Sequence, residues 1–422
     1  MLDCIYDIDY WKTYVQSSNF SLDQIPDLTS KVAIVTGANV GLGFETALEL
    51  ARNGAHVFLA CRNKTKALLA IEKIERELAE TAPHLYPKLD FLFLDLADLR
   101  SVARSANAFL AKGLRLDILV NNAGIGLIPP TLSKDGVELV FAINHLGHFL
   151  FTQLLLPKLI ESQPSRIVCV SSMGHDLALP QGGIQFGTLS LADEEPPIVN
   201  YNRSKLANIL YVKALARRLT AAGHDRVYVN AVHPGFCMTD IDVNVGNAVG
   251  YVAAQVMLKT RELLGRPAAD GALTQLYCAT SPQIEEKNLS GRYFVPDGHE
   301  LRPGPFAMDT DLQERLYKYS EDFMVKRGLL SNHEDVYGGK THHSKLSHEA
   351  IAGAASYEAM KEYQKNQESG HHKLTKEAFA GLAGAEADKL FETKGLSHLD
   401  RERVRRQTEE NAGRIHDQIY GM

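Results

Sequence analysis

The chain has 422 residues, of which 45% are hydrophobic and 23% charged, enough apolar material for one large domain and a smaller one. Its formal net charge of −6 argues against a nucleic-acid-binding protein. The five cysteines are scattered and fit neither a disulfide framework nor a zinc site. They are Cys4, Cys61, Cys169, Cys237 and Cys278.

The sequence favours a cytoplasmic protein without a membrane span. No continuous apolar run reaches the roughly 18 to 20 residues that a span needs. The start, Met1-Leu2-Asp3-Cys4, lacks the basic region and apolar core of a signal peptide. Residues 1–27 are expected to pack an extra turn or helix against the domain that follows, and the alternative is a loose leader. Their aromatic residues are Tyr6, Tyr10, Trp11, Tyr14 and Phe20.

A strand, a glycine-rich turn and a helix follow in that order. The β-branched, apolar residues 31–36 predict a buried strand, and a helix is expected from Leu42 to Gly54. Such a turn presents unpaired backbone N–H groups and a positive dipole end to a pyrophosphate, although a plain turn between a strand and a helix also uses glycine. The candidate cofactor contacts here are Gly37, Asn39, Val40, Gly41, Leu42 and Gly43.

The next predicted strand, residues 56–60, ends where a dinucleotide-binding fold selects its cofactor. An acidic residue there would bind the ribose hydroxyls of NAD, whereas arginine favours the 2′-phosphate of NADP. This chain has Arg62 and Lys64 and no acid at that point. We therefore predict NADP(H), because charge-assisted contacts to phosphate are strong. The alternative is a solvated arginine on a loop.

Tyr201 and Lys205 stand one helical turn apart, ahead of the amphipathic stretch 206–219, so both side chains should leave one face of a helix. A phenol titrates near pH 10, and a nearby ammonium stabilises the phenolate and brings the group nearer its working range. Taken alone, the same spacing is typical of an ordinary helix with a packed tyrosine and a solvated lysine.

Together with further motifs, these features resemble the short-chain dehydrogenase/reductase family over about residues 28–330. Asp95 and Leu96, after an apolar strand at 91–94, match its adenine pocket. Asn144 matches the catalytic asparagine, and Ser172, after a strand at 166–170, matches the catalytic serine better than Ser171 does. The Asn-Asn-Ala-Gly signature, after a strand at 118–120, and the loop that holds the nicotinamide carboxamide supply the remaining cofactor contacts: Asn122, Ala123, Gly124, Pro234, Gly235 and Thr239.

The resemblance implies a Rossmann-type, doubly wound parallel α/β sheet and hydride transfer to or from a carbonyl carbon. Tyr201 would donate the proton to the carbonyl oxygen, and Lys205 would lower the tyrosine pKa and hold the nicotinamide ribose. Ser172 would hydrogen-bond the substrate oxygen, and Asn144 would position a water that relays protons to Lys205.

The substrate expectation comes from a long insertion, residues 173–200, between Ser172 and Tyr201. A similar insertion occurs in retinol-dehydrogenase-like reductases, which share the Ala-Cys-Arg end of the second strand and the run 204–210. The resemblance points to bulky apolar carbonyl substrates such as steroids, retinoids or polyketides. Residues 245–264 are an adaptable substrate wall or, equally, plain core. The domain is expected to close with a helix at 268–280, a last strand at 291–295 and a helix around Leu312, Leu316, Tyr317 and Phe323.

Beyond residue 330 the composition of the sequence changes. Residues 331–346 read as a polar linker, and residues 347–422 predict a small all-α domain of three helices, starting near Ser347, Thr375 and Ser397. This tail resembles a fungal antibiotic-induced (concanamycin-induced protein C-like) family of unknown function. We expect no metal in it, because polar linkers often carry solvated histidines and no cysteine lies nearby. The histidines are His342, His343, His348, His371 and His372.

Two classes of function remain at this point. The first is an NADP(H)-dependent reductase or dehydrogenase acting on a small carbonyl or alcohol, forming a homo-oligomer as its relatives do. The second is a cofactor-sensing scaffold whose helical tail mediates protein interactions. The retained set of Asn144, Ser172, Tyr201 and Lys205 favours the enzyme, because a sensor does not need proton-relay residues.

Overall fold

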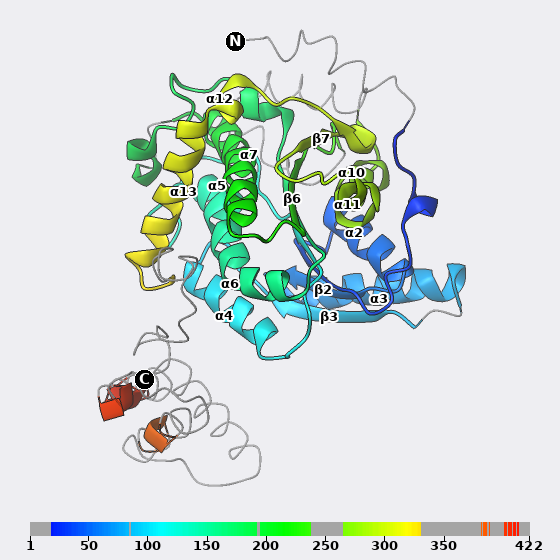
Figure 1. The fold of residues 1–422 in the computed structure, drawn as a ribbon, viewed down its shortest axis with the longest axis horizontal. Helices are drawn as coiled ribbons and strands as arrows, with labels where there is room; N and C mark the ends of the chain where they lie inside the picture. Colours follow the sequence, from blue (N-terminus) through cyan, green and yellow to red (C-terminus); the bar gives the residue numbers. More distant parts are fainter. Residues whose placement is uncertain are drawn as a thin grey trace. The chain divides into compact units, whose positions relative to one another are not determined.

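The computed structural model describes residues 18–83, 86–191, 195–237 and 265–330, with 381, 383–385, 388, 401–402, 404–406, 408–410 and 412. The chain divides into two compact units, Met1–His333 and Glu334–Met422, which we describe one at a time. The first unit, coloured from blue to yellow in Figure 1, contains an eight-stranded sheet.

The sheet confirms the predicted α/β fold. Its strands are β1 (Val32–Thr36), β2 (His56–Cys61), β3 (Lys88–Phe93), β4 (Ile118–Asn121), β5 (Ser165–Val170), β6 (Val227–Val232), β7 (Tyr293–Val295) and β8 (His299–Glu300). Their spatial order is β3-β2-β1-β4-β5-β6-β7-β8, and all neighbours run parallel except β7 and β8. The strand order changes direction between β1 and β4, which is where doubly wound folds bind their ligands.

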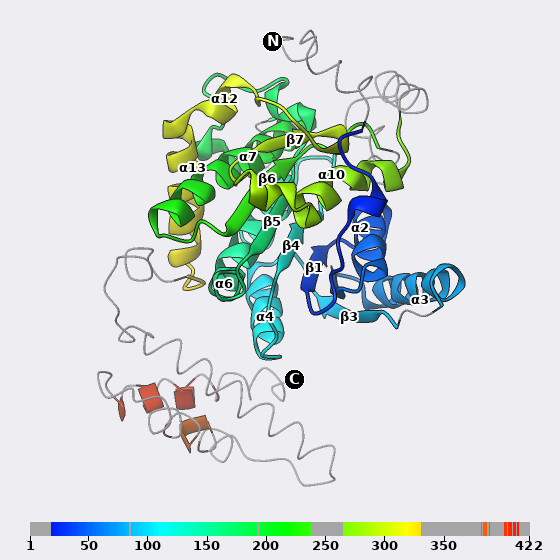
Figure 2. The ribbon, with the colours of Figure 1, turned by 45° about the vertical axis from the view of Figure 1, so that its right-hand side comes forward.

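Helices cover both faces of this sheet (Figures 1 and 2). α2, α3 and α10 lie on one face, α4, α6 and α7 lie on the other, and α13 packs on the outside of α7. The predicted helices at 42–54, 268–280 and the closing position are confirmed as α2, α10 and α13. The helices are α2 (Gly41–Arg52), α3 (Lys64–Thr81), α4 (Leu99–Leu110), α5 (Leu139–Phe141), α6 (Gly147–Glu161), α7 (Pro197–Ala221), α10 (Ala268–Thr280), α11 (Gln283–Glu286), α12 (Pro305–Met308) and α13 (Thr310–Val325).

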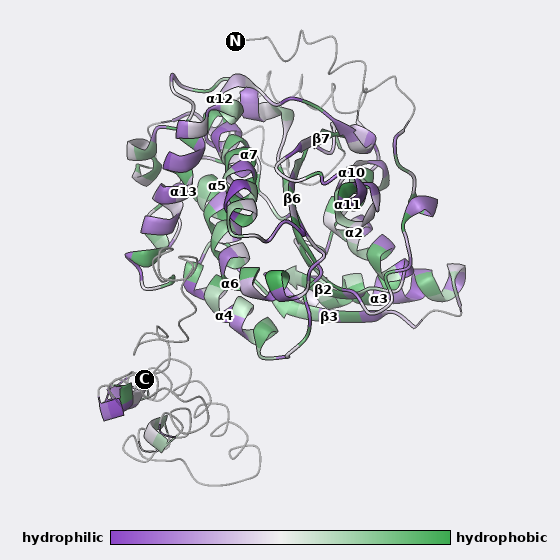
Figure 3. Cartoon of the chain, viewed as in Figure 1, coloured by the Kyte–Doolittle hydropathy of each residue, from purple (hydrophilic) through white to green (hydrophobic). Residues whose placement is uncertain are grey.

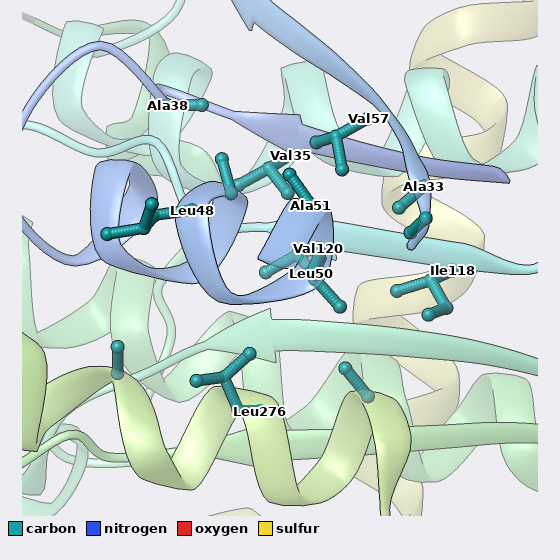
Figure 4. Close-up of a cluster of buried hydrophobic side chains, with 14 of the residues drawn as sticks. Ala33, Val35, Ala38, Leu48, Leu50, Ala51, Val57, Ile118, Val120 and Leu276 are labelled. Carbon is teal, nitrogen blue, oxygen red and sulfur yellow. The ribbon is translucent and has the colours of Figure 1, made fainter. Parts of the chain in front are cut away.

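An apolar cluster fixes α2 and α10 against the sheet (Figure 4). Val35 of β1, Val120 of β4, Leu50 of α2 and Leu276 of α10 are all 0% exposed. Burial of this apolar surface is the main force that holds the turn between β1 and α2 in place. Figure 3 shows the same division of character, with largely green strands in β2 and β3 and purple stretches on the outer helix α13.

Most predicted strands agree with the structure to within one or two residues, and the edge strands differ more. β3 starts at Lys88, before the predicted residue 91, because it is an edge strand with half-exposed polar residues that hide its periodicity. β7 is not the last strand, since the chain turns through Asp297 and adds the two-residue antiparallel β8. A two-residue strand is too short to leave a hydrophobic pattern.

The expectation that the chain has no segment long and apolar enough to span a membrane is wrong for one helical segment. Residues Leu139–Glu161 meet that test by length and composition, with a mean hydropathy of 1.5 over the best window. However, 83% of that window is buried inside the unit, as in the core helix of a globular domain. The segment consists of α5, the π-helix η2 (Ala142–Leu146) and α6.

The insertion after Ser172 is more ordered than a plain loop. It contains two 3₁₀ helices, η3 (Met173–Asp176) and η4 (Phe186–Ser190), and α7 already begins at Pro197. The buried Arg203 donates to the Thr188 hydroxyl at 3.0 Å, and the backbone N–H of Glu138 donates to Leu189 O at 2.8 Å. These bonds fasten η4 to α5 and α7.

The described part of the N-terminal region, residues 18–27, packs on the first unit as expected. It forms the 3₁₀ turn η1 (Leu22–Gln24), and Phe20 is 2% exposed with its ring 5.6 Å from that of Tyr277. The other aromatic residues of the N-terminal region lie outside the described residues.

In the second unit, the described residues at 381–388 and 401–412 are helical, within the predicted second and third helices. Asp388 accepts from Arg401 at 2.7 Å and from Arg405 at 3.2 Å, so the two helical segments are joined by ion pairs. Ala383 and Val404 are 0% exposed. The predicted first helix and the histidines of the tail lie outside the described residues.

Candidate active site

The turn between β1 and α2 is shaped by glycine. Gly37 and Gly41 have φ of 66° and 60°, values that residues with a Cβ rarely adopt. A Cβ on Gly43 would lie 2.5 Å from both Gly37 O and Asn122 Nδ2. The N-cap of α2 is Val40, whose side chain cannot accept a hydrogen bond, so the first N–H groups of α2 remain available to an anion.

This turn forms one wall of a cavity of about 420 Å³. Twelve of the predicted cofactor contacts line it: Gly37, Asn39, Val40, Gly41, Leu42, Gly43, Arg62, Asp95, Leu96, Asn122, Ala123 and Gly124. Sequence reasoning missed the apolar part of the lining, because isolated aliphatic residues carry no motif. These are Ala60, Cys61, Leu94, Ile125, Gly126, Ile128 and Ile143.

Arg62 gives the cavity a cationic edge. It follows β2 directly, is exposed and lines the cavity, while Lys64 starts α3 and is not among the lining residues. The neighbouring Cys61 does not act as an anion, because burial raises the pKa of its thiol to about 11. The carboxylate of Asp95 also lines the cavity and accepts from Ala97 N at 3.1 Å.

Thr36, the last residue of β1, holds the turn after β4. Its hydroxyl oxygen lies 2.9 Å from the N–H groups of both Asn122 and Ala123. The Asn122 amide donates to Thr36 O at 2.8 Å and accepts from the buried Gln275 at 3.3 Å. Two adjacent walls of the cavity are therefore joined by hydrogen bonds.

Asn144 lies in the π-helix η2 and is fully buried. Its side chain accepts from Ile125 N at 2.9 Å and donates to Ile125 O and to Ser204 Oγ, both at 3.0 Å. It thus links the loop after β4 to the helix α7. π-helical turns are uncommon and frequently occur at functional sites.

Tyr201 and Lys205 both lie on α7, as predicted, and the Lys205 ammonium is 5.5 Å from the Tyr201 ring centre. Lys205 is 2% exposed, and burial lowers its pKa to about 8. Its Nζ donates to Val170 O at 3.1 Å, where Asn208 also donates at 3.0 Å. The end of β5 therefore orients the ammonium.

The two serines after β5, Ser171 and Ser172, make different hydrogen bonds. Ser171 is buried and its hydroxyl donates to Lys205 O at 2.7 Å, so it supports the helix. Ser172 is half-buried and caps η3 by accepting from Gly174 N at 3.1 Å. The hydroxyl proton of Ser172 is not used in that bond. This geometry favours Ser172 as the serine that could meet a substrate.

The loop after β6 approaches the glycine turn. Gly235 has φ of 89°, and a Cβ on Gly271 of α10 would meet both Cys237 Sγ and a methyl group of Leu42. Pro234 and Gly235 are buried and do not line the cavity. Thr239 and residues 245–264 lie outside the described residues.

Gly124 lines the cavity, and the side chains of Asn144 and Lys205 lie close behind it. A Cβ at this position would lie 3.2 Å from Asn144 Oδ1 and 3.6 Å from Lys205 Nζ. The cavity thus has a glycine turn that fits a pyrophosphate, and its lining includes a cation, Arg62, and a carboxylate, Asp95. Lys205 lies behind Gly124, and neither Lys205 nor Tyr201 is among the lining residues. These residues fit a nicotinamide dinucleotide. Within the described ranges, no group of three or more metal-ligating side chains occurs.

Comparison with known proteins agrees with this geometry. A family model described as short chain dehydrogenase matches residues 31–184, and one described as virulence factor CipC-like matches residues 332–419. The second match confirms the resemblance predicted for the tail.

Individual relatives cover most of the first unit. An uncharacterized oxidoreductase of Schizosaccharomyces pombe is 40% identical over 323 residues, 73% of this chain and 89% of the relative. Retinol dehydrogenase 14 of Homo sapiens is 40% identical over 307 residues, 71% of this chain and 87% of the relative. A crystal structure of an uncharacterized protein from Mycobacterium paratuberculosis matches with a TM-score of 0.56 and 31% identity, covering 73% of this chain and 98% of that chain.

Fold, site geometry and relatives lead to one assignment. The chain is an oxidoreductase that acts on alcohol or carbonyl groups, and it belongs to the short-chain dehydrogenase/reductase family.

Proposed function

We propose that this protein is an NADP(H)-dependent reductase of a bulky, apolar ketone or aldehyde. The observation that carries the proposal is the position of Lys205 and Asn144 directly behind Gly124, which lines the cavity. When bound, the cofactor supplies or accepts the hydride. The residues of the protein bind the cofactor, orient the substrate and transfer protons.

The proton chemistry belongs to Tyr201. Its hydroxyl donates to the carbonyl oxygen during reduction, and the Lys205 ammonium stabilises the phenolate that remains. Ser172 donates its free hydroxyl proton to the same oxygen. Asn144 holds the loop at Ile125 and, through Ser204, the helix that carries Tyr201. These roles for the four residues support catalysis in a fixed geometry.

Arg62 supports the choice of NADP(H), because it lines the cavity directly after β2, where dinucleotide-binding folds recognise the 2′-phosphate, and no acidic residue follows β2 there. The substrate class is supported by the 40% identity to retinol dehydrogenase 14 and by the insertion packed after Ser172. We also propose that the enzyme unit forms a homo-oligomer, which light scattering would test.

The test is oxidation of NADPH and NADH, followed at the nicotinamide absorbance, with aromatic, steroid, retinoid and polyketide-like carbonyls. We expect turnover with NADPH and at least one apolar carbonyl. Tight NADPH binding without turnover for any compound would contradict the proposal.

That result would favour a second function, a cofactor-sensing scaffold. The observation behind it is that residues 332–419 match a family outside the dehydrogenases, and that all of them from Glu334 onward belong to the second compact unit. In a scaffold, nucleotide binding by the first unit would control an interaction made by the second.

A further inference from the structure

His148 lies in the first turn of α6 and connects two parts of the site. It is 3% exposed, its Nε2 is 2.9 Å from Thr36 Oγ1, and its Nδ1 is 3.2 Å from Asn144 O. Thr36 holds the cavity wall and Asn144 belongs to the polar set behind Gly124. The imidazole is therefore the bridge between the cofactor turn and the π-helix.

The protons of this bridge can be assigned from its neighbours. A backbone carbonyl only accepts, so Nδ1 must carry the proton that faces Asn144 O. Nε2 of the neutral ring is then an acceptor. The Thr36 hydroxyl donates to it at 2.9 Å in preference to Val120 O, which lies farther away at 3.4 Å. Both lone pairs of Thr36 Oγ1 are left for the N–H groups of Asn122 and Ala123, each 2.9 Å away.

A charged ring would break this arrangement, because Nε2–H would point at an oxygen that already accepts two hydrogen bonds. The surroundings oppose the charge as well. Burial lowers the pKa of His148 to about 4, and the nearby Lys205 ammonium acts in the same direction. The tautomer is thus fixed on both sides, which is how histidines are oriented when they position other groups.

We propose that His148 is a positioning residue that sets the Thr36 hydroxyl for the cofactor turn and the Asn144 backbone for proton transfer. The second half of this statement rests on the proposed function, whereas the first half concerns cofactor binding alone.

Two substitutions separate the two bonds. His148→Asn places an amide near the position of Nδ1, which keeps the donor to Asn144 O and removes the acceptor for Thr36. His148→Gln places its terminal group near Nε2, which keeps an acceptor for Thr36 and removes the donor to Asn144 O. We expect His148→Asn to raise the Kd for NADPH roughly two- to tenfold with kcat nearly unchanged, the size of one buried hydrogen bond. His148→Gln should lower kcat by a similar factor at an almost unchanged Kd.

His145 provides the matched control. It lies in the π-helix η2, which also carries Asn144, is 1% exposed, and pairs with Ser320 of α13 at 3.0 Å. It also bonds the Asn208 side chain, and it does not line the cavity. His145→Asn and His145→Gln should alter Tm and leave both Kd and kcat within twofold. If the His148 variants change Kd and kcat by equal factors, or change Tm alone as the His145 variants do, the proposal is wrong.

A measurement on the unaltered full chain covers the case in which the variants fail to fold. ¹⁵N NMR of histidine-labelled protein should show His148 as the neutral Nδ1–H tautomer at pH 7, and an Nε2–H tautomer would overturn the proposal. If no carbonyl is turned over, the proposed function fails, while the tautomer and the NADPH Kd of His148→Asn still decide the positioning role.

Discussion

Lys205 is an ionisable residue whose burial works against the stability of the fold. Its pKa falls from 10.5 to about 8 on burial, so the folded state binds its proton less tightly than the unfolded state does. The cost is present in full below pH 8 and is relieved as the pH rises from 8 to about 10.5. The proposed relay role of Lys205 would explain why a buried lysine is kept at the expense of stability, as is common for functional groups.

We predict that Lys205→Met abolishes turnover but does not destabilise the protein. The shift corresponds to a penalty on the order of 3 kcal/mol, of which part is offset by the lost bond to Val170 O. That carbonyl still accepts from Asn208. Urea unfolding at pH 7 should give an equal or higher free energy of unfolding, with the exposed Lys64→Met as control. A loss of more than about 1 kcal/mol would contradict this account.

Arg62 determines the cofactor preference in this account. Arg62→Ala should raise the Kd for NADPH at least tenfold, because a contact between a charged group and phosphate is worth about 1.5–3 kcal/mol. The Kd for NADH should change little, since that cofactor lacks the 2′-phosphate. Fluorescence titration measures both values, and Lys64→Ala, which does not line the cavity, is the control. Equal losses for the two cofactors would refute the role.

The residues with chemical motifs were predictable from sequence, and those that orient them were not. Tyr201 and Lys205 are four positions apart, so helical spacing alone brings them together. Thr36 and His148 are 112 residues apart, and only the packing of α6 beside β1 and β4 joins them. The sequence motif favoured Ser172 over Ser171 as the catalytic serine, but the physical reason came from the structure. The Ser171 hydroxyl is bonded to Lys205 O of α7.

At the scale of elements, the turn from β1 into α2 leaves no room for an added side chain at Gly43. We predict that Gly43→Ala weakens NADPH binding more than tenfold and lowers stability by about 1–3 kcal/mol. The added methyl group would lie 2.5 Å from Gly37 O, which is backbone and cannot move aside cheaply. NADPH titration and thermal unfolding measure the two effects.

Gly187→Ala is the matched control for that substitution. A Cβ on Gly187, in η4, would meet nothing within 4 Å, so we expect neither NADPH affinity nor stability to fall. NADPH affinity of Gly43→Ala within twofold of the unaltered protein would show that the turn does not hold the pyrophosphate.

Strands in the sheet interior were predicted well because both of their faces are buried. β1 and β5 were both predicted, are buried at every position and contain apolar runs. β6 is also buried at every position, but it was not predicted. The edge strands β3 and β8 have no such run. The order of the insertion also escaped prediction, because η4 is held by Arg203 and Glu138, which the sequence does not connect to it.

At the scale of the whole molecule, the described parts of the cavity and of the polar set lie within Met1–His333. We predict that a chain ending at Leu330 retains kcat and NADPH Kd within twofold. α13 ends at Val325, so the truncation leaves the helix that packs on α7 intact. Steady-state kinetics of the truncated and full chains provide the measurement.

Loss of turnover on truncation, with NADPH binding and cooperative thermal unfolding both retained, would mean that the second unit takes part in catalysis. The change in residue composition near residue 330 predicts that the chain has two parts. It gave no mechanism for the second part, because an alanine-rich helical pattern specifies packing and carries no chemistry.

We propose that Tyr201 is the proton donor in the reduction of a carbonyl substrate. The most direct measurement compares Tyr201→Phe with the unaltered protein in NADPH oxidation, using the best carbonyl found in the panel. We predict that kcat falls by about 10²- to 10⁴-fold while the Kd for NADPH stays within twofold. Turnover by Tyr201→Phe within tenfold of the unaltered protein would contradict the account.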